Sequence, residues 1–231
     1  MGITGFHGYL EFLENNIMER VLVVGATGHT GKRVIEILNS SNTFEPYAMI
    51  RKEDQKQMFE DMDVETVLAD LEKDVTETVQ GMDKVIFAAG SGGNTGEDKT
   101  IAIDQNGAIK MIDAAKQAKV KKFVMLSSMG ADNPDVNKDL KVYLEAKGKA
   151  DEHLKNSGLT YTILRPGSLT DDLGLAKVKL AEKLNESGEI SRDDVAFLLV
   201  MSLADPLVKN KTIEALEGKE SIKDAIIEAS R

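Results

Sequence analysis

The sequence predicts a single α/β domain built on a doubly wound parallel sheet. Short apolar runs alternate with longer segments of helical period, which is the pattern of successive β-α-β units. Of the 231 residues, 42% are hydrophobic and 29% are charged, a balance typical of one globular domain with a full core. Because no stretch is rich enough in Pro, Gly or Ser to act as a linker, we expect one domain rather than two.

The first half of the chain supplies four predicted strands, each a short β-rich run of the kind that parallel sheets bury. They cover residues 20–24, 46–50, 64–68 and 84–88. Between the first two strands, residues 32–38 place apolar side chains on one helical face, so we expect a helix that packs on the sheet there.

The alternation continues up to a sixth strand. Helical patterns cover residues 98–118 and 139–154, and strands are expected at 122–126 and 160–164. We expect Arg165-Pro166-Gly167 to end the sixth strand, because proline has no N–H group to donate to a ladder.

Beyond residue 167 the pattern changes. Ser191 followed by Asp194 is a capping pattern, and it begins a predicted helix whose apolar body covers residues 195–203. Residues 211–216 resemble a final strand. We expect this part of the chain to form a short C-terminal substrate cap on the domain.

Residues 1–17 precede the first strong strand and lack the basic start and apolar core of a signal peptide. We interpret them as an N-terminal extension outside the core, since chain termini are usually loosely held. The domain then spans residues 18–231.

Composition excludes several kinds of chemistry and partner. The chain has no cysteine, so disulfides, thiolate nucleophiles, Cys-ligated zinc and iron–sulfur clusters are excluded. A formal net charge of −10 disfavours binding to nucleic acid or to an anionic membrane. No apolar run reaches the roughly 18 residues of a membrane-spanning helix. We therefore expect a cytoplasmic protein that acts on a small molecule, as a monomer or a homodimer.

Three glycines lie between the first strand and the first helix, in the run Gly25-Ala26-Thr27-Gly28-His29-Thr30-Gly31. Gly25 allows a tight turn off the strand, Gly28 allows close approach of a pyrophosphate, and Gly31 allows the helix to pack on the strand. The helix N-terminus offers free N–H groups and a positive dipole end to an anion. The place of this loop between a strand and a helix predicts a dinucleotide site.

A nucleoside-triphosphate loop of the form GxxxxGK[ST] does not fit the same residues. Five residues separate Gly25 from Gly31, and Arg33 stands where a hydroxyl residue would hold magnesium. A kinase or an ATPase is therefore disfavoured.

The residue that follows the second strand indicates which dinucleotide is bound. An acidic residue there usually holds the ribose of NAD, whereas an arginine accommodates the 2′-phosphate of NADP. Here Arg51 occupies this place and Lys52 follows it, so NADP is predicted over NAD. The alternatives are that Arg51 and Lys52 only begin a solvated helix, or that Glu53 reaches the ribose hydroxyls of NAD.

These features resemble the atypical short-chain dehydrogenase/reductase superfamily, and specifically its NmrA-like and flavin-reductase-like branch, whose members are often named NAD-dependent epimerase/dehydratase. The resemblance runs from Arg20 to about Leu216. It implies a Rossmann-type fold in which the glycine loop, with Thr27, His29 and Thr30, holds the cofactor. Short stretches at strand ends and on one helix carry the rest of the resemblance: Asp70-Leu71, Ala88-Ala89-Gly90, Ser127-Ser128, Tyr143-x-x-x-Lys147 and Arg165-Pro166-Gly167-Ser168-Leu169. The resemblance implies that these stretches, apart from Ser128 and Arg165, also contact the cofactor.

The resemblance implies a catalytic role for Tyr143 and Lys147, and physical chemistry supports it. Four residues apart on a helix, the two side chains project from one face and can act on one ligand. A neighbouring ammonium and an oxidised nicotinamide favour the ionised phenol, which makes Tyr143 a usable proton donor or acceptor. Lys147 would also hold the ribose hydroxyls. We expect Ser128 to orient a substrate carbonyl, with Ser127 as the alternative.

One residue departs from the superfamily pattern. Aligning on Gly107 places Asp104 where many members carry an asparagine, and an ionised carboxylate cannot donate the hydrogen bonds of an amide. This puts a proton relay through that position in doubt. His7 and His153 have no evident partners for a metal site, so no metal is expected. The glycine-rich loop 91–96 either shapes the substrate opening or is a surface loop.

Three functions follow as hypotheses. The preferred one is an NADP(H)-dependent oxidoreductase acting on a small carbonyl, quinone or flavin-like substrate. The alternatives are a regulatory protein that senses NADP without turnover, as the resemblance to NmrA-like proteins allows, and an NAD(P)-dependent epimerase or dehydratase. The short segment after Gly167 leaves little material for a sugar-nucleotide lobe.

Overall fold

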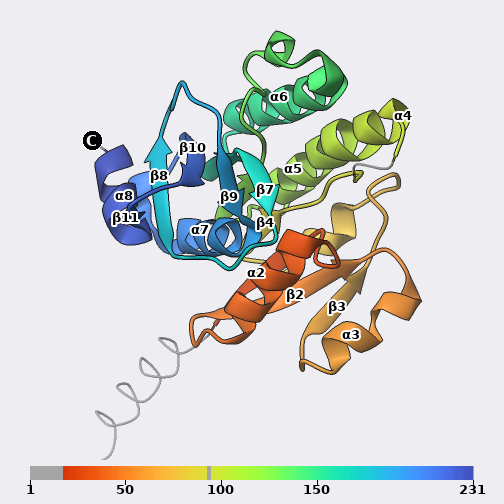
Figure 1. The fold of residues 1–231 in the computed structure, drawn as a ribbon. Helices are drawn as coiled ribbons and strands as arrows, with labels where there is room; N and C mark the ends of the chain where they lie inside the picture. The colour runs from red at the N-terminus through yellow and green to blue at the C-terminus, as the bar shows by residue number, and fades with distance from the viewer. Residues whose placement is uncertain (1–17, 93–94, 231) are drawn as a thin grey trace, which may run out of the picture.

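A nine-stranded sheet runs through the protein in the computed structural model, which describes residues 18–92 and 95–230 (Figure 1). The expected extension at residues 1–17 lies outside the described residues. The strand order is β3-β2-β1-β4-β5-β6-β10-β8-β11. The strands in this sheet are β1 (Glu19–Val24), β2 (Phe44–Ile50), β3 (Glu65–Leu68), β4 (Lys84–Phe87), β5 (Lys122–Leu126), β6 (Tyr161–Pro166), β8 (Lys177–Ala181), β10 (Lys211–Glu217) and β11 (Glu220–Ser221).

The topology is that of a doubly wound Rossmann-type sheet, as predicted. From β1 the chain builds outward through β2 and β3, returns to β4 on the other side of β1, and builds outward again through β5 and β6. All of these pairs are parallel, and β10 joins β6 in parallel. Among the described strands of this sheet only β8 is reversed, and it pairs antiparallel with both β10 and β11 at the C-terminal edge. Ligands of such sheets bind at the strand carboxyl ends where the order reverses, between β1 and β4.

Helices cover both faces of the sheet. On one face α2 lies beside α7, and on the other face lie α5 and α6 (Figure 1). The α-helices are α2 (His29–Asn39), α3 (Gln57–Glu60), α4 (Glu97–Thr100), α5 (Ala108–Gln117), α6 (Lys141–Asn156), α7 (Arg192–Ala204) and α8 (Ile222–Ala229). Short 3-10 turns, η1 (Glu53–Gln55), η2 (Thr76–Val79), η4 (Pro134–Val136), η5 (Lys138–Leu140) and η6 (Pro206–Val208), fill the connections.

Strand β1 is a continuous apolar run because its side chains enter the core on both faces of the sheet. Val21 and Val23 belong to the core cluster on the α2 face, whereas Leu22 and Val24 belong to the cluster on the α5 face. Because both faces are covered, all four side chains are at most 1% exposed.

The predicted helix 98–118 is continuous but changes its winding. It begins as α4, ends as α5, and forms a π-helix, η3 (Ile101–Gly107), between them. π-Helical turns are rare and frequently occur at functional sites. Asp104 lies in this segment and is 1% exposed.

Two predicted strand ends need correction. β2 begins at Phe44 rather than at Pro46. β6 does not end at Leu164 but continues through Pro166, which pairs with Ala215 of β10. Pro166 has no N–H group to donate, but its carbonyl accepts a hydrogen bond from the Met129 N–H group at 3.0 Å, so a proline fits at this position.

The chain beyond residue 167 contains more structure than was predicted. Ser191 caps α7 through the Asp194 N–H group at 3.1 Å, as expected. The predicted final strand at residues 211–216 is β10. The unpredicted strands are β8 and β11, which extend the main sheet beyond β10, and β7 (Ser168–Thr170), which pairs with β9 (Glu189–Ser191) in a small second sheet. None of the helices among the described residues is long and apolar enough to cross a membrane.

Lys122, at the start of β5, gives the fold a measurable pH dependence. The residue is 6% exposed, and burial, together with the nearby Lys84 charge, lowers the pKa of its side chain to about 8. In the unfolded chain the pKa of a lysine is near 10.4. Between pH 8 and pH 10.4 the unfolded chain therefore keeps a proton that the folded chain has lost, and the free energy of unfolding rises with pH. We expect Lys122→Met to stabilise the fold by about 3 kcal/mol at pH 7 and to remove a rise of about 1.5 kcal/mol between pH 8 and 9.5. Urea unfolding of both proteins at the three pH values measures this, and parallel pH profiles would contradict it.

Candidate functional site

The glycine turn after β1 leaves no room for a side chain at two positions. Gly25 has φ +86°, and a Cβ built there would lie 2.6 Å from the backbone nitrogen of Ala89. A Cβ on Gly31 would lie 2.1 Å from the carbonyl oxygen of Gly25. The turn off β1 therefore lies directly against the end of β4, a contact that was not predicted, and α2 packs directly on the turn, which agrees with the role expected for Gly31.

The N-terminus of α2 faces the larger of two adjoining cavities. Gly28 is the N-cap and has no side chain that could accept a hydrogen bond from the first N–H groups of the helix. Gly28, His29 and Thr30 line the cavity. The first turn therefore presents backbone donors and the positive end of the helix dipole, which suits a diphosphate.

The two cavities meet along the carboxyl end of β4. The β2-side cavity has a volume of about 310 Å³, and the α6-side cavity has a volume of about 580 Å³. Both are bordered by Ala89, Gly90 and Ser91, so they form one elongated depression across the switch point of the sheet. An extended ligand with two ends, such as a dinucleotide, fits this shape.

Arg51 lines the β2-side cavity immediately after β2. The N–H groups of Arg51 and Lys52 both donate to the Gln55 side-chain oxygen, at 2.9 and 3.0 Å, which fixes the backbone after the strand. The Lys52 side chain, predicted to bind cofactor, is exposed and borders neither cavity. Of the two basic residues, only Arg51 is positioned to contact a ligand there.

The rest of this cavity matches the sequence-predicted residues. Gly25, Thr27, Asp70, Leu71, Ala89 and Gly90 all line it. Sequence reasoning missed Lys99, which also lines the cavity and pairs with Glu72 at 2.7 Å. Its partner lies 27 residues away in the sequence, and no local pattern predicts that pairing.

Tyr143 and Lys147 both line the α6-side cavity, as their spacing on one helix predicted. The Lys147 ammonium lies 5.7 Å from the centre of the Tyr143 ring. It also donates to the Leu126 carbonyl at 3.3 Å and lies 3.1 Å from the Asp104 carboxylate, with only 4% of the residue exposed. Burial alone would lower the pKa of Lys147, but the charges of Tyr143 and Asp104 outweigh it and raise that pKa above its usual value.

Asp104 is the residue that pairs with this lysine. Its second carboxylate oxygen accepts a hydrogen bond from the Ser91 N–H group at 2.9 Å, which holds the start of the loop after β4. One oxygen thus accepts a hydrogen bond, whereas the buried oxygen that faces Lys147 accepts none from the described residues and is held by the ion pair alone. Asp104, which aligns with the asparagine of many superfamily members, thus forms a buried ion pair with Lys147.

The two candidate serines do not lie as expected. Ser128, our first choice for orienting a substrate, lines a third cavity instead of the α6-side cavity, and its hydroxyl donates to the Met129 carbonyl at 3.2 Å. Ser127 does line the α6-side cavity, but its hydroxyl donates to the buried Asp151 carboxylate at 2.8 Å. Neither hydroxyl is therefore free beside Tyr143, because both are committed to partners within the protein.

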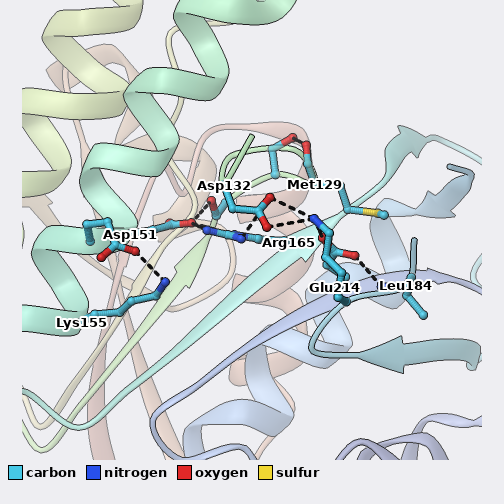
Figure 2. Close-up of polar contacts among 11 residues, drawn as sticks. Met129, Asp132, Asp151, Lys155, Arg165, Leu184 and Glu214 are labelled. Carbon is cyan, nitrogen blue, oxygen red and sulfur yellow. Dashed lines mark hydrogen bonds and ion pairs between the residues drawn. The ribbon is translucent and has the colours of Figure 1, made fainter. Parts of the chain in front are cut away.

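A buried network of charges begins at Ser127 and extends to the third cavity. Figure 2 shows Arg165 lying between Asp151 and Asp132. Arg165 is 2.9 Å from Asp151 and 3.5 Å from Asp132. Burial raises the pKa of Asp151, against the lowering effect of the arginine. This network joins β6 to α6 beneath the site and explains why a charged pair can be fully buried there.

The network ends at Glu214 in β10, a carboxylate with no exposed surface. Lys183 lies 2.9 Å from both Asp132 and Glu214, and the Leu184 N–H group donates to Glu214 at 2.7 Å (Figure 2). Sequence reasoning missed this network, because its members come from five separate segments and carry no recognisable spacing.

The remaining predicted residues divide between the cavities. Leu169, Ala88, Ala89 and Gly90 line the α6-side cavity, whereas the third cavity is bordered by Pro166, Gly167 and Ser168, which were predicted to bind cofactor. Lys183 and Glu214 border this third cavity as well. The segment after β6 thus first turns away from the glycine loop and then returns to it at Leu169 and at Asp171, which lies 3.9 Å from His29.

Arg192 is a further residue that sequence reasoning missed. It lines the α6-side cavity and pairs with Asp171 at 3.1 Å. His29 lies 3.9 Å from the same carboxylate, and His153 pairs with Asp113 at 2.7 Å. His7 lies outside the described residues. Within residues 18–92 and 95–230, no group of three or more His, Asp or Glu side chains could hold a metal ion.

Comparison with known proteins adds an independent finding. A family model described as NAD(P)H-binding matches residues 25–206. A Bacillus subtilis (strain 168) protein named "Uncharacterized sugar epimerase YhfK" is 42% identical over 211 residues, which cover 90% of this chain and 98% of that protein. A solved protein of Bacillus halodurans, named as a candidate NAD-dependent epimerase/dehydratase, is 38% identical with a TM-score of 0.87, over 91% of this chain and 99% of that one. Sanguinarine reductase of Eschscholzia californica is 28% identical over 89% of this chain and 91% of that protein.

Proposed function

This chain belongs to the NAD(P)H-binding family of atypical short-chain dehydrogenases/reductases, and we propose that it is an NADP(H)-dependent oxidoreductase. Its substrate is a small carbonyl, quinone or flavin-like compound. One observation carries the proposal: Tyr143, Lys147 and the N-terminus of α2 all border the same cavity. The site therefore combines a proton-transfer group with a place for a diphosphate. Sanguinarine reductase among the relatives supports a reductase, whereas the more similar Bacillus proteins carry the names of epimerases.

The residues of the glycine turn fit a dinucleotide. Amides of Gly28, His29 and Thr30 would hold the diphosphate, and Arg51 would form a charge-assisted fork with a 2′-phosphate. When bound in reduced form, the nicotinamide ring supplies a hydride. The chain's own residues then have to orient that ring, exclude water and deliver a proton.

Tyr143 is the group that would deliver the proton. Reduction of a carbonyl or a quinone leaves an oxygen anion, and a phenol within hydrogen-bond reach can protonate it as the negative charge develops. Lys147 stabilises the phenolate that Tyr143 leaves behind, since its ammonium lies 5.7 Å from the ring centre. The ion pair with Asp104 holds Lys147 in place and also offsets part of its charge.

The cofactor preference depends on Arg51. We expect Arg51→Ala to weaken NADPH binding by about tenfold or more, because an arginine–phosphate fork is lost, and to change NADH binding by less than about threefold. Isothermal titration of each cofactor measures both. Lys52→Ala is the matched control, because the Lys52 side chain borders neither cavity. Equal losses for the two cofactors in Arg51→Ala would refute the role in binding the 2′-phosphate.

A screen of turnover tests the proposed function. Purified protein with NADPH is mixed with quinones, oxidised flavins and small carbonyls, and NADPH oxidation is followed by absorbance. We expect at least one class to be reduced well above the rate without protein. Binding of NADPH without reduction of any acceptor would contradict the enzyme and favour the alternative, a sensor of NADP. The buried Asp104–Lys147 pair is the observation that favours that alternative, since it restrains the lysine that the active enzyme uses.

A further inference from the structure

We propose that Arg192 binds the nicotinamide-side phosphate of the dinucleotide, and that Asp171 occupies the place of this phosphate until the cofactor displaces it. The inference rests on the proposed function and adds two residues to its cofactor site. It comes from an exposed carboxylate that basic side chains hold beside the first turn of α2.

Three basic side chains from two helices surround the Asp171 carboxylate, which directly follows β7. Arg192, the first residue of α7, lies 3.1 Å from one carboxylate oxygen. Arg33 and His29 of α2 lie 3.5 and 3.9 Å from the other oxygen. One carboxylate thus bridges the Arg192 guanidinium and the first turn of α2. A phosphate is an anion that can make the same two contacts.

Arg192 is the arginine of this group that faces the ligand. It borders the α6-side cavity together with the first turn of α2, whose amides are expected to hold the diphosphate. Arg33 instead lines a separate hollow between α2 and α7, where it pairs with Asp193 and donates to the His29 carbonyl at 2.8 Å. Since the adenosine end is expected in the β2-side cavity, Arg192 is placed for the phosphate on the nicotinamide side.

The chain segment that carries Asp171 does not depend on the Asp171 contacts for its position. The Asp171 side chain is 58% exposed. Two other carboxylates, in the first turn of α7, hold the backbone that follows. The Gly174 N–H group donates to Asp193 at 3.1 Å, and the Ala176 N–H group donates to Asp194 at 2.8 Å. The Asp171 side chain can therefore turn away while the segment stays in place.

Binding of a diphosphate would exchange a weak contact for a stronger one. The exposed pair of Asp171 and Arg192 is weakened by water and salt, whereas a diphosphate carries two negative charges and accepts a fork from the guanidinium. The diphosphate also accepts hydrogen bonds from the free amides at the start of α2. A carboxylate that stayed beside it would repel it at close range. Asp171 therefore opposes the binding that Arg192 favours.

Two single substitutions with opposite expected effects test the proposal. Arg192→Gln should weaken NADPH binding by about tenfold or more, because the contact between guanidinium and phosphate is lost. Asp171→Asn should tighten it by about threefold to tenfold, because Arg192 is freed and a competing charge is removed. With both substitutions together, the gain from Asp171→Asn should fall below about twofold, since the two residues act on one contact. Calorimetric titration at physiological ionic strength measures all three proteins.

The neighbouring carboxylate provides a matched control. Asp172 is exposed like Asp171, and among residues 18–92 and 95–230 no basic side chain pairs with it. Asp172→Asn makes the same change in net charge and should alter NADPH affinity by less than about twofold. Arg20→Gln is the control for loss of an arginine, because Arg20 lies at the amino end of β1 and pairs with Glu45 at 3.4 Å. Its NADPH affinity should equal that of the unaltered protein.

Two ligands without a nicotinamide ring locate the contact. Adenosine 2′,5′-bisphosphate carries the 2′-phosphate and only the adenosine-side phosphate, whereas 2′-phospho-ADP-ribose carries both phosphates of the diphosphate. We expect Arg192→Gln to weaken binding of 2′-phospho-ADP-ribose by about tenfold or more and binding of the bisphosphate by less than about threefold. Thermal unfolding of each variant shows whether it is folded before titration.

Two results would overturn the proposal. One is NADPH binding by Asp171→Asn that is no tighter than binding by Asp172→Asn, and the other is an equal effect of Arg192→Gln on the two ring-free ligands. If Arg192→Gln fails to fold, the two asparagine variants still decide the outcome, because both change only an exposed carboxylate. Failure of the unaltered protein to bind both NADPH and 2′-phospho-ADP-ribose would instead overturn the proposed cofactor site, and this inference with it.

Discussion

Replacing Gly31 by alanine is expected to weaken dinucleotide binding by about 1,000-fold or more, equivalent to about 4 kcal/mol. The added Cβ would lie 2.1 Å from the Gly25 carbonyl oxygen and 2.8 Å from its carbon, and both belong to backbone that cannot rotate away. The helix α2 would have to move off the turn, and its N-terminal amides would move with it. The loss comes from displacement of the diphosphate donors rather than from a lost contact.

Calorimetric titration with NADPH measures the loss, and far-ultraviolet circular dichroism with thermal unfolding shows whether the variant is folded. Gly28→Ala is the graded control. Its Cβ would lie 3.2 Å from the same carbonyl oxygen, which a shift of a few tenths of an ångström can relieve, so a smaller loss is expected. A folded Gly31→Ala protein that binds NADPH within tenfold of the unaltered protein would contradict this account of the turn.

Removing the Tyr143 hydroxyl is expected to lower kcat for a carbonyl or quinone acceptor by about 100- to 10,000-fold, the usual contribution of a positioned acid–base group. The phenylalanine keeps the ring beside Lys147 and takes away only the group that transfers the proton. NADPH affinity should stay within about threefold, because the hydroxyl is not among the diphosphate donors.

Steady-state kinetics with saturating NADPH, together with a separate binding titration, measure the two effects of Tyr143→Phe independently. Tyr161→Phe is the matched control, since Tyr161 lies in β6 and borders neither ligand cavity. An unchanged kcat in Tyr143→Phe would remove this tyrosine from the mechanism. A large loss of NADPH binding in the same variant would show that it acts on the cofactor instead of the substrate.

The parts of the fold that the sequence predicts well are those with local constraints. Strand β1 is apolar at every buried position because both of its faces are covered, and Gly31 is required by the backbone of Gly25, which lies six residues earlier in the same loop. Tyr143 and Lys147 share one helix face by their spacing alone. Such features need no knowledge of the rest of the chain.

The misplaced residues depend on distant partners. The choice between Ser127 and Ser128 is decided by Asp151, 24 residues from Ser127 on α6, which holds the Ser127 hydroxyl. Pro166 continues β6 because it pairs with Ala215 of β10, almost 50 residues later in the chain, at a position where its missing N–H group is not required. Neither partner shows a pattern in the sequence, so the direction of these side chains could not be predicted from the strand end alone.

The charge pairs at the site show the same limitation. Asp104 was recognised as unusual from its alignment, but its contact with Lys147 depends on the π-helical turn that carries it. A π-helix shifts the register of side chains relative to an α-helix, and no periodicity in residues 98–118 indicated it. The ion pair therefore emerged only from the three-dimensional arrangement.

The most direct measurement is a calorimetric titration of the unaltered protein with NADPH and, separately, with NADH. Amides at the head of α2 and the Arg51 guanidinium should together give one NADPH site per chain, with a Kd of about 10 μM or tighter and a clear margin over NADH. Absence of heat from both reduced cofactors and from their oxidised forms, in a protein that unfolds cooperatively, would contradict the assignment of this turn as a dinucleotide site.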